Sequence, residues 1–163
     1  MSSINGTVAS FCVREVVTVT RETPVYQCAQ LMHDEHVGAV VIVDQTNGKR
    51  MPVGILTDRD IAIEVVAFDV AARTITAGDL MNGELAVARL TDDLSTVLAT
   101  MRKHGVRRLP VVDGEGYLEG IVTADNLWET LAEVVDSLAN LTRAEHARER
   151  KTRAAEARRS QRE

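Results

Sequence analysis

An internal repeat constrains this chain more than any other feature of its sequence. The stretch G-I-L-T-D-R-D at residues 54–60 returns as the variant G-I-V-T-A-D-N at residues 120–126. When the first half is shifted by 69 positions, one apolar pattern also falls on another: Val25, Cys28, Ala29 and Met32 coincide with Leu94, Val97, Leu98 and Met101. Both patterns have the i, i+3, i+4, i+7 spacing that places four side chains on one helix face. The two halves therefore predict the same fold.

Each half also contains a buried strand and a hairpin. Residues 40–44 (V-V-I-V-D) correspond to residues 109–113 (L-P-V-V-D), and an apolar run that ends in a turn residue is typical of a buried strand. After these strands the offset falls from 69 to 66, because the first half has three extra residues in its turn from Gln45 to Pro52. Each unit is predicted as strand, helix, strand, turn, strand, helix, which is an α+β fold.

This order of elements resembles the cystathionine-β-synthase (CBS) domain, on the pattern V-x-V, amphipathic helix, apolar strand ending in V-V-D, and G-I-x-T-x-x-D/N. One unit has roughly 50–60 residues, too few to bury an adequate core alone, so we expect two units packed by pseudo-two-fold symmetry into one module. The resemblance implies a stand-alone CBS pair with an N-terminal extension (1–10), a first repeat (11–70), a second repeat (71–140) and a charged helical or disordered tail (141–163).

Composition excludes several classes of protein. The sequence has no apolar run of 18 residues and no basic start followed by an apolar stretch, so it predicts neither a membrane span nor a secretory signal, and we expect a cytoplasmic protein. Cys12 and Cys28 have no metal-ligand or redox spacing and are expected to be reduced, and no metal is expected at His33 and His36. A nucleophile paired with a base is absent, as are the Walker and dinucleotide glycine motifs, so we do not expect an enzyme.

The repeated T-x-x-D/N motif has two interpretations. As a capping box, Thr57 with Asp60 and Thr123 with Asn126 would satisfy the backbone N–H groups of their own helix starts. As a ligand site, two such helix starts beside one cleft would favour phosphate, and the Asp60 carboxylate could accept two hydrogen bonds from ribose, with Asn126 a weaker equivalent. Apolar walls for an adenine ring are expected from four residues: Ile55, Ile121, Val19 and Ala88.

The two copies differ before the strands that begin near residues 39 and 108. The first copy has Gly38-Ala39 there, and the second has Arg107-Arg108. We therefore expect the cleft built on Thr123 and Asn126, together with both arginines, to tolerate more phosphate groups than the cleft built on Thr57 and Asp60. The alternative that the arginines are solvated or pair with acidic groups remains open. The CBS resemblance implies adenosine-containing ligands, namely AMP, ADP, ATP, NAD or S-adenosylmethionine.

Charge is divided unevenly along the chain. Residues 143–163 hold eight Lys or Arg and four Glu, a net charge of +4. Residues 1–142 therefore carry a net charge of −9, which gives the total of −5. Before this tail, an apolar seam with steps of 4, 3, 4 and 3 predicts one continuous helix and a surface for a homodimer: Leu127, Leu131, Val134, Leu138 and Leu141.

The sequence thus predicts a regulatory module that binds an adenosine ligand between its repeats and signals through its own assembly or an effector protein. One alternative is a structural dimer or scaffold with vestigial clefts. The other is a nucleic-acid-associated regulator that acts through the basic tail, although only five aromatic residues are present and they form no stacking platform for single strands.

Overall fold

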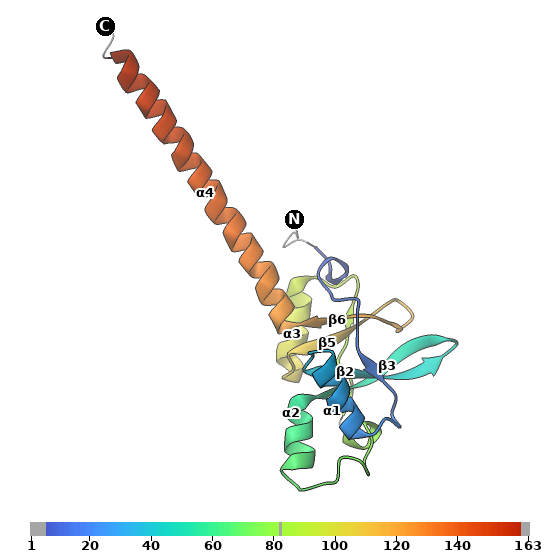
Figure 1. Cartoon of the computed structure of the whole chain (residues 1–163). Coiled ribbons are helices and arrows are strands. Elements are labelled where there is room, and N and C mark those ends of the chain that lie inside the picture. Colours follow the sequence, from blue (N-terminus) through green and yellow to red (C-terminus); the bar gives the residue numbers. More distant parts are fainter. Residues whose placement is uncertain (1–5, 82, 161–163) are drawn as a thin grey trace.

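The structure is a computed structural model that describes residues 6–81 and 83–160, with the side chains of Glu149 and residues 151–160 outside the described set. Both halves have the predicted order of strand, helix, strand, strand, helix (Figure 1). The first half contains β1 (Thr18–Val19), α1 (Val25–Asp34), β2 (Ala39–Thr46), β3 (Lys49–Thr57) and α2 (Asp58–Ile61), followed by a π-helix, η2 (Ala62–Val66). The second half contains β4 (Ala88–Arg89), α3 (Leu94–His104), β5 (Arg108–Val112), β6 (Leu118–Thr123) and α4 (Ala124–Ser160). Short 3-10 helices, η1 (Val8–Ser10) and η3 (Gly78–Leu80), precede the two halves.

Each half forms a three-stranded sheet, in the orders β1-β2-β3 and β4-β5-β6. The first strand pairs in parallel with the second, which forms an antiparallel hairpin with the third. The β2–β3 hairpin turns at Asn47 and Gly48, whose φ angles of 53° and 74° are positive, as two-residue hairpin turns require. This longer hairpin accommodates the three extra residues of the first half. At its tip, Lys49 Nζ lies 3.0 Å from Glu115 Oε2 of the other hairpin.

The core has two main clusters, one for each repeat, and a third that joins them. Ile42 and Leu56 are each 1% exposed in the first cluster, and Leu109 is fully buried in the second. Between the sheets, Val41 and Leu118 pack together with neighbours from both repeats. The two repeats therefore form one module, as predicted, because neither sheet covers its inner face alone. Burial raises the pKa of the Cys28 thiol to about 11, so this thiol is neutral at physiological pH.

The segment before each repeat packs into the core of the other repeat. Val8 is fully buried among residues of the second repeat, and its N–H donates to Asp92 O over 2.8 Å. Ala77, which corresponds to Val8 at the offset of 69, is fully buried in the first repeat. Residues 6–10 are therefore part of the module and not the extension that the sequence suggested. Domain assignment by order along the chain misses this exchange, because packing depends only on proximity in space.

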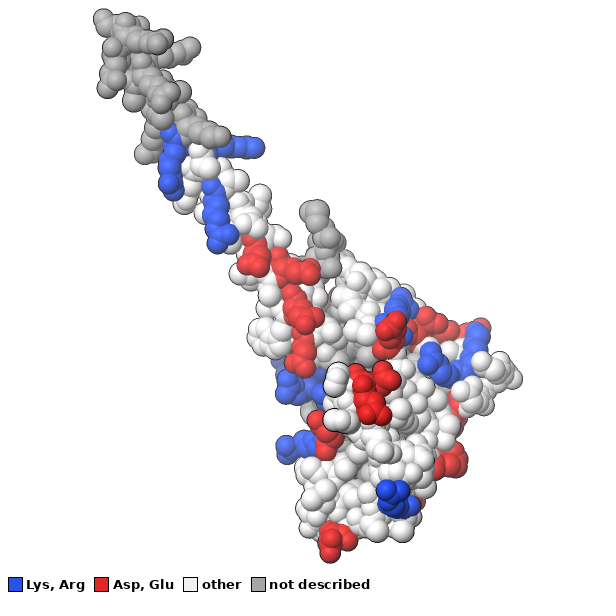
Figure 2. Space-filling model, in the orientation of Figure 1, with Lys and Arg blue, Asp and Glu red and all other residues white. Residues whose placement is uncertain are grey.

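Helix α4 leaves the body after its first turns (Figure 1). Leu127 is 7% exposed in the core of the second repeat, but Leu131, Leu138 and Leu141 are 42%, 59% and 68% exposed. The predicted continuous helix is confirmed, since α4 runs to Ser160. Figure 2 shows Asp and Glu side chains along the part of α4 near the body and Lys or Arg farther along it. The apolar seam beyond Leu127 is therefore left uncovered in the single chain.

Candidate functional site

The first helix start is held by a capping box. Thr57 Oγ1 accepts a hydrogen bond from Asp60 N over 3.2 Å, while Asp60 Oδ2 accepts from Thr57 N over 2.9 Å and from Thr57 Oγ1 over 2.7 Å. The capping interpretation of the motif is thus confirmed. It is compatible with ligand binding, because the Asp60 carboxylate accepts both of its bonds through Oδ2, and Asp60 Oδ1 has no hydrogen bond to any residue that the structure describes.

The second helix start has the same geometry with different chemistry. Asn126 Oδ1 accepts from Thr123 N over 3.2 Å and from Thr123 Oγ1 over 2.8 Å, and Asn126 N donates to Thr123 Oγ1 over 3.2 Å. The amide oxygen is therefore occupied, and the group that Asn126 can offer to a ligand is its NH₂ donor. The two motifs hold their helices alike but present opposite hydrogen-bonding groups.

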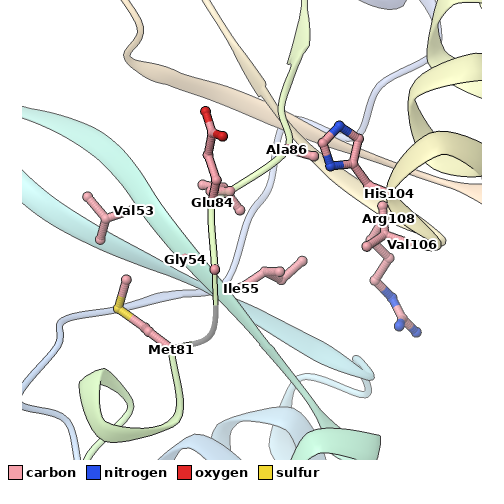
Figure 3. A pocket seen from close by; sticks show the side chains of 11 residues that line it. Val53, Gly54, Ile55, Met81, Glu84, Ala86, His104, Val106 and Arg108 are labelled. Atoms are coloured by element: carbon pink, nitrogen blue, oxygen red, sulfur yellow. The ribbon is translucent and has the colours of Figure 1, made fainter.

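A cleft of about 630 Å³ lies at the first helix start. The first repeat contributes Thr57 and Asp60 to its walls, and the second repeat contributes the turn from Gly105 to Arg108. A smaller cavity of about 200 Å³ shares Ile55, Val106 and Arg108 with this cleft. Figure 3 shows Ile55 and Ala86 beside this cavity, with the Arg108 side chain directed away from Ala86. Together they offer a polar mouth and an apolar recess, and we call them cleft 1.

Cleft 2 is a cavity of about 310 Å³ at the second helix start. Thr123 and Asn126 contribute one wall, and the turn from His36 to Ala39 of the first repeat contributes the opposite wall. Glu15 and Asp125 also line this cleft. Each cleft thus combines the capped helix start of one repeat with the helix-to-strand turn of the other.

This cross-pairing corrects the expected grouping of the arginines. Arg107 lines cleft 1 and not the cleft of Thr123 and Asn126, and Arg108 lines both. The sequence grouped the arginines with Thr123 because all three belong to the second repeat, and Arg108 does pair with Thr123 in the sheet. However, packing the repeats by pseudo-symmetry turns each helix start toward the opposite repeat. Arg107 also pairs with an acidic group, which was the alternative left open by the sequence: its Nη2 lies 3.3 Å from Asp125 Oδ1 in an exposed ion pair.

Arg108 occupies the space between the clefts. It is half-buried and makes no hydrogen bond or ion pair with the described part of the chain. A Cβ atom added at Gly38 would lie 2.9 Å from Arg108 Nη2 and 3.2 Å from Asp58 Oδ2. The absence of a side chain at Gly38 therefore provides the space that the Arg108 guanidinium occupies. The first repeat has the uncharged Ala39 where the second has Arg108, so one cation serves both clefts.

Two of the four expected apolar wall residues lie elsewhere. Ile55 and Ile121 line clefts 1 and 2, respectively, as expected. Val19 and Ala88 are 6% and 1% exposed in the repeat cores and line neither cleft. The cleft-lining residues stand before these strands, because each first strand runs from the cleft mouth into the core. They are Val16 and Val17 for cleft 2, and Leu85 and Ala86 for cleft 1.

Other sites are not found in the ranges that the structure describes. Among the side chains that the structure describes, no group of three or more His, Cys, Asp or Glu could hold a metal ion. Within the same ranges, no helix combines the length and apolar character that a membrane crossing requires. Clefts 1 and 2 are therefore the candidate site.

Comparisons with known proteins agree with the fold and the repeat. The model of the CBS domain family matches residues 8–67 and 77–127. The CBS domain-containing protein YhcV of Bacillus subtilis is 34% identical over 127 residues, which are 78% of this chain and 84% of that protein. An uncharacterized protein of Methanopyrus kandleri is 33% identical over 114 residues, which are 70% of this chain but only 57% of that protein. A CBS domain protein from Pyrobaculum aerophilum, solved in complex with AMP, has the same fold with a TM-score of 0.69 at 23% identity, covering 80% of this chain and 98% of that one.

Proposed function

The chain belongs to the CBS domain family, and from that premise we propose that it is a regulatory module that binds adenosine-containing ligands in clefts 1 and 2. One observation carries the proposal. Arg108 is a half-buried cation without a partner among the described residues, and it stands between two helix starts that offer groups for a ribose. A guanidinium in such a position suits a phosphate, which it can bind with two parallel hydrogen bonds.

Cleft 1 fits an adenine nucleotide. The free Asp60 Oδ1 can accept hydrogen bonds from ribose hydroxyls, and Ile55, Met81 and Ala86 supply an apolar surface for the base. Arg107 and Arg108 supply positive charge at the polar mouth. The cleft with both arginines is the better phosphate site, so we assign AMP, ADP, ATP or NAD to cleft 1. This reverses the preference expected from the sequence, because Arg107 lines cleft 1 alone and Arg108 lines both clefts.

Cleft 2 fits a ligand that carries less negative charge. Glu15 and Asp125 line it with Arg108 as its one arginine, whereas in cleft 1 three arginines (Arg59, Arg107 and Arg108) balance the three carboxylates of Asp58, Asp60 and Glu84. Carboxylates repel phosphate, whereas the Asn126 NH₂ group can still donate to a ribose oxygen. Adenosine or a ligand with a cationic group, such as S-adenosylmethionine, suits this cleft better than ATP does. A second AMP would depend on Arg108.

Binding would regulate by shifting the arrangement of the repeats. A ligand in either cleft touches both repeats, so it favours the arrangement in which that cleft is closed. The signal would pass to an effector protein or to the assembly of the chain, and we propose a homodimer through the exposed seam of α4. The family match is to a regulatory domain, in agreement with the prediction that the chain is not an enzyme. A cytoplasmic location is part of the same proposal.

Calorimetric titration tests the ligand assignment. Adenosine, AMP, ATP, NAD and S-adenosylmethionine are titrated into the wild type, Asp60→Ala and Asn126→Ala. Asp79→Ala is the matched control, because Asp79 forms the same capping box with Thr76 but lines neither cleft. We expect Asp60→Ala to weaken AMP by about tenfold or more, as for a hydrogen bond to a charged group, and the control to leave binding unchanged. Absence of heat with every compound would refute the proposal and favour a structural dimer.

A second titration separates the nucleic-acid alternative. The chain without residues 143–163 lacks the excess positive charge of the tail. If the tail binds nucleic acid, its removal will abolish a salt-dependent interaction with a polyanion such as heparin or duplex DNA. Equal polyanion binding by both chains, together with AMP binding by both, is the result that the proposed function requires.

A further inference from the structure

The position of Arg108 raises a question about the two clefts together. Its side chain contributes to the walls of both, and its guanidinium lies against Gly38 in cleft 2 and near Asp58 in cleft 1. The first repeat provides no equivalent cation, because Ala39 stands at the corresponding position. A phosphate in either cleft would thus draw on the same positive group.

We propose that Arg108 couples the clefts, so that a phosphorylated adenosine ligand in one lowers the affinity of the other for such a ligand. This inference rests on the proposed function, since it takes both clefts as adenosine sites. An adenine nucleotide in cleft 1 orients the guanidinium toward its phosphate and removes it from cleft 2. The phosphorylated ligand then meets the Glu15 carboxylate in cleft 2 without the cation that lines this cleft, since Arg107 reaches it only through its exposed ion pair with Asp125.

The sign of the coupling holds even if the guanidinium reaches two phosphates at once. A phosphate monoester carries a charge of about −1.5 to −2 at neutral pH, so two of them would share a single positive charge. The excess negative charge would make the second binding step weaker than the first. Cleft 1 should fill first, because it also contains Arg107, which does not line cleft 2. Adenosine has no phosphate and should bind without this coupling.

The test compares AMP binding in cleft 2 when cleft 1 is intact and when it is disabled. Asp60→Ala removes the ribose acceptor of cleft 1 and should free Arg108. We expect AMP to bind cleft 2 of Asp60→Ala about tenfold to a hundredfold more tightly than cleft 2 of the wild type, the range for one hydrogen bond to a charged group. In the Arg108→Gln background, Asp60→Ala should no longer change cleft 2. Asp79→Ala is the control, because Asp79 lines neither cleft and its removal should leave both AMP affinities unchanged.

The backbone amide signals of a ¹H–¹⁵N spectrum identify which cleft is filled. Gly105 lines cleft 1 and Val16 lines cleft 2, so AMP should move Gly105 first and Val16 only at higher concentration. Gly38→Ala gives an independent route, because its Cβ would displace the guanidinium. We expect this variant to lose AMP affinity as Arg108→Gln does, while the unfolding temperature without ligand stays close to the wild type.

The outcomes separate this inference from the proposed function. If neither AMP nor adenosine binds the wild type, both fail. If AMP binds cleft 1 but the affinity of cleft 2 is the same in the wild type and Asp60→Ala, or cleft 2 takes no AMP in either protein, the coupling is refuted and the proposed function stands. A gain of affinity in cleft 2 that persists in the Arg108→Gln background would assign the coupling to another group and would also overturn the inference.

Discussion

The two glycines of the repeated G-I-x-T motif are predicted to differ sharply in their tolerance of alanine. A Cβ at Gly120 would lie 2.8 Å from the backbone oxygen of Val13 and 3.1 Å from Cys12 Sγ. That oxygen is fixed, because Val13 and Ile121 exchange two backbone hydrogen bonds of 2.9 Å. A Cβ at Gly54 would instead meet only side-chain atoms, Cγ and Cε of Met81 at 3.1 Å and Cδ1 of Ile42 at 3.2 Å.

The expected change in unfolding free energy depends on which atoms must shift to make room for the new Cβ. Overpacking against the fixed backbone at Gly120 costs about 1–3 kcal/mol, and the reduced entropy of the unfolded chain returns about 0.4–1 kcal/mol. Gly120→Ala should therefore lower the free energy of unfolding by about 1–2 kcal/mol. At Gly54 the flexible Met81 can shift, so the net change should be within about 0.5 kcal/mol. Gly114→Ala is the control, because no atom lies within 4 Å of its added Cβ.

Equilibrium urea unfolding, followed by circular dichroism, measures the three variants against the wild type. The slopes with denaturant should be equal, so that midpoint shifts report stability alone. Hydrogen exchange at the Val13 and Ile121 amides should accelerate in Gly120→Ala, since these groups form the displaced contact. The reasoning would be refuted if Gly54→Ala lost as much unfolding free energy as Gly120→Ala, or if Gly120→Ala were as stable as the wild type. Either result would mean that the backbone at Val13 can shift as easily as a methionine side chain.

Two further predictions concern assembly and acid stability. The double variant Leu131→Glu with Leu138→Glu should convert the proposed dimer into a monomer in sedimentation experiments, because it places charges on the exposed seam. The control is Asn140→Glu with Ala144→Glu, which adds the same charge off the seam and should leave the dimer intact. Asp93 caps α3, and its hydrogen bond from the Thr96 backbone holds the pKa of the carboxyl below its ordinary value. A carboxyl whose pKa is lowered in the folded state stabilises the fold at pH values above its ordinary pKa, and this stabilisation is lost as the pH falls. Asp93→Asn should therefore be less stable than the wild type at pH 7. In urea titrations between pH 5 and pH 3, it should lose less stability than the wild type does.

The order of elements and the caps of the two T-x-x-D/N motifs could be predicted because they are local properties of the sequence, and eight of the ten residues expected at the ligand clefts line one of them. Apolar periodicity placed α1 and α3, and the T-x-x-D/N spacing placed the caps at Thr57 and Thr123. The repeat then supplied the packing of two units, since a pattern that occurs twice and cannot bury its core alone indicates a pair.

The relative placement of the repeats could not be predicted from local patterns. The burial of Val8 and Ala77 in the opposite repeats has no periodic signal, because each lies in a short segment between regular elements. The choice of cleft for Arg107 also depends on where the other repeat sits. Val19 and Ala88 were misplaced for a smaller reason: the V-x-V pattern locates the strand, but not the point at which the strand leaves the cleft and enters the core.

The asymmetry between the clefts follows from the electrostatics of a duplicated module. Arg108 reaches Gly38, the residue that corresponds to Arg107, so equivalent segments of the two repeats meet between the clefts. If Ala39 were also an arginine, two guanidinium groups would compete for one half-buried space. At a separation of 4 Å and an effective dielectric constant near 20, their repulsion would be about 4 kcal/mol. A cation on one repeat and small residues on the other avoid this repulsion and still leave one guanidinium between the clefts, which is the basis of the different ligand preferences that we propose for them.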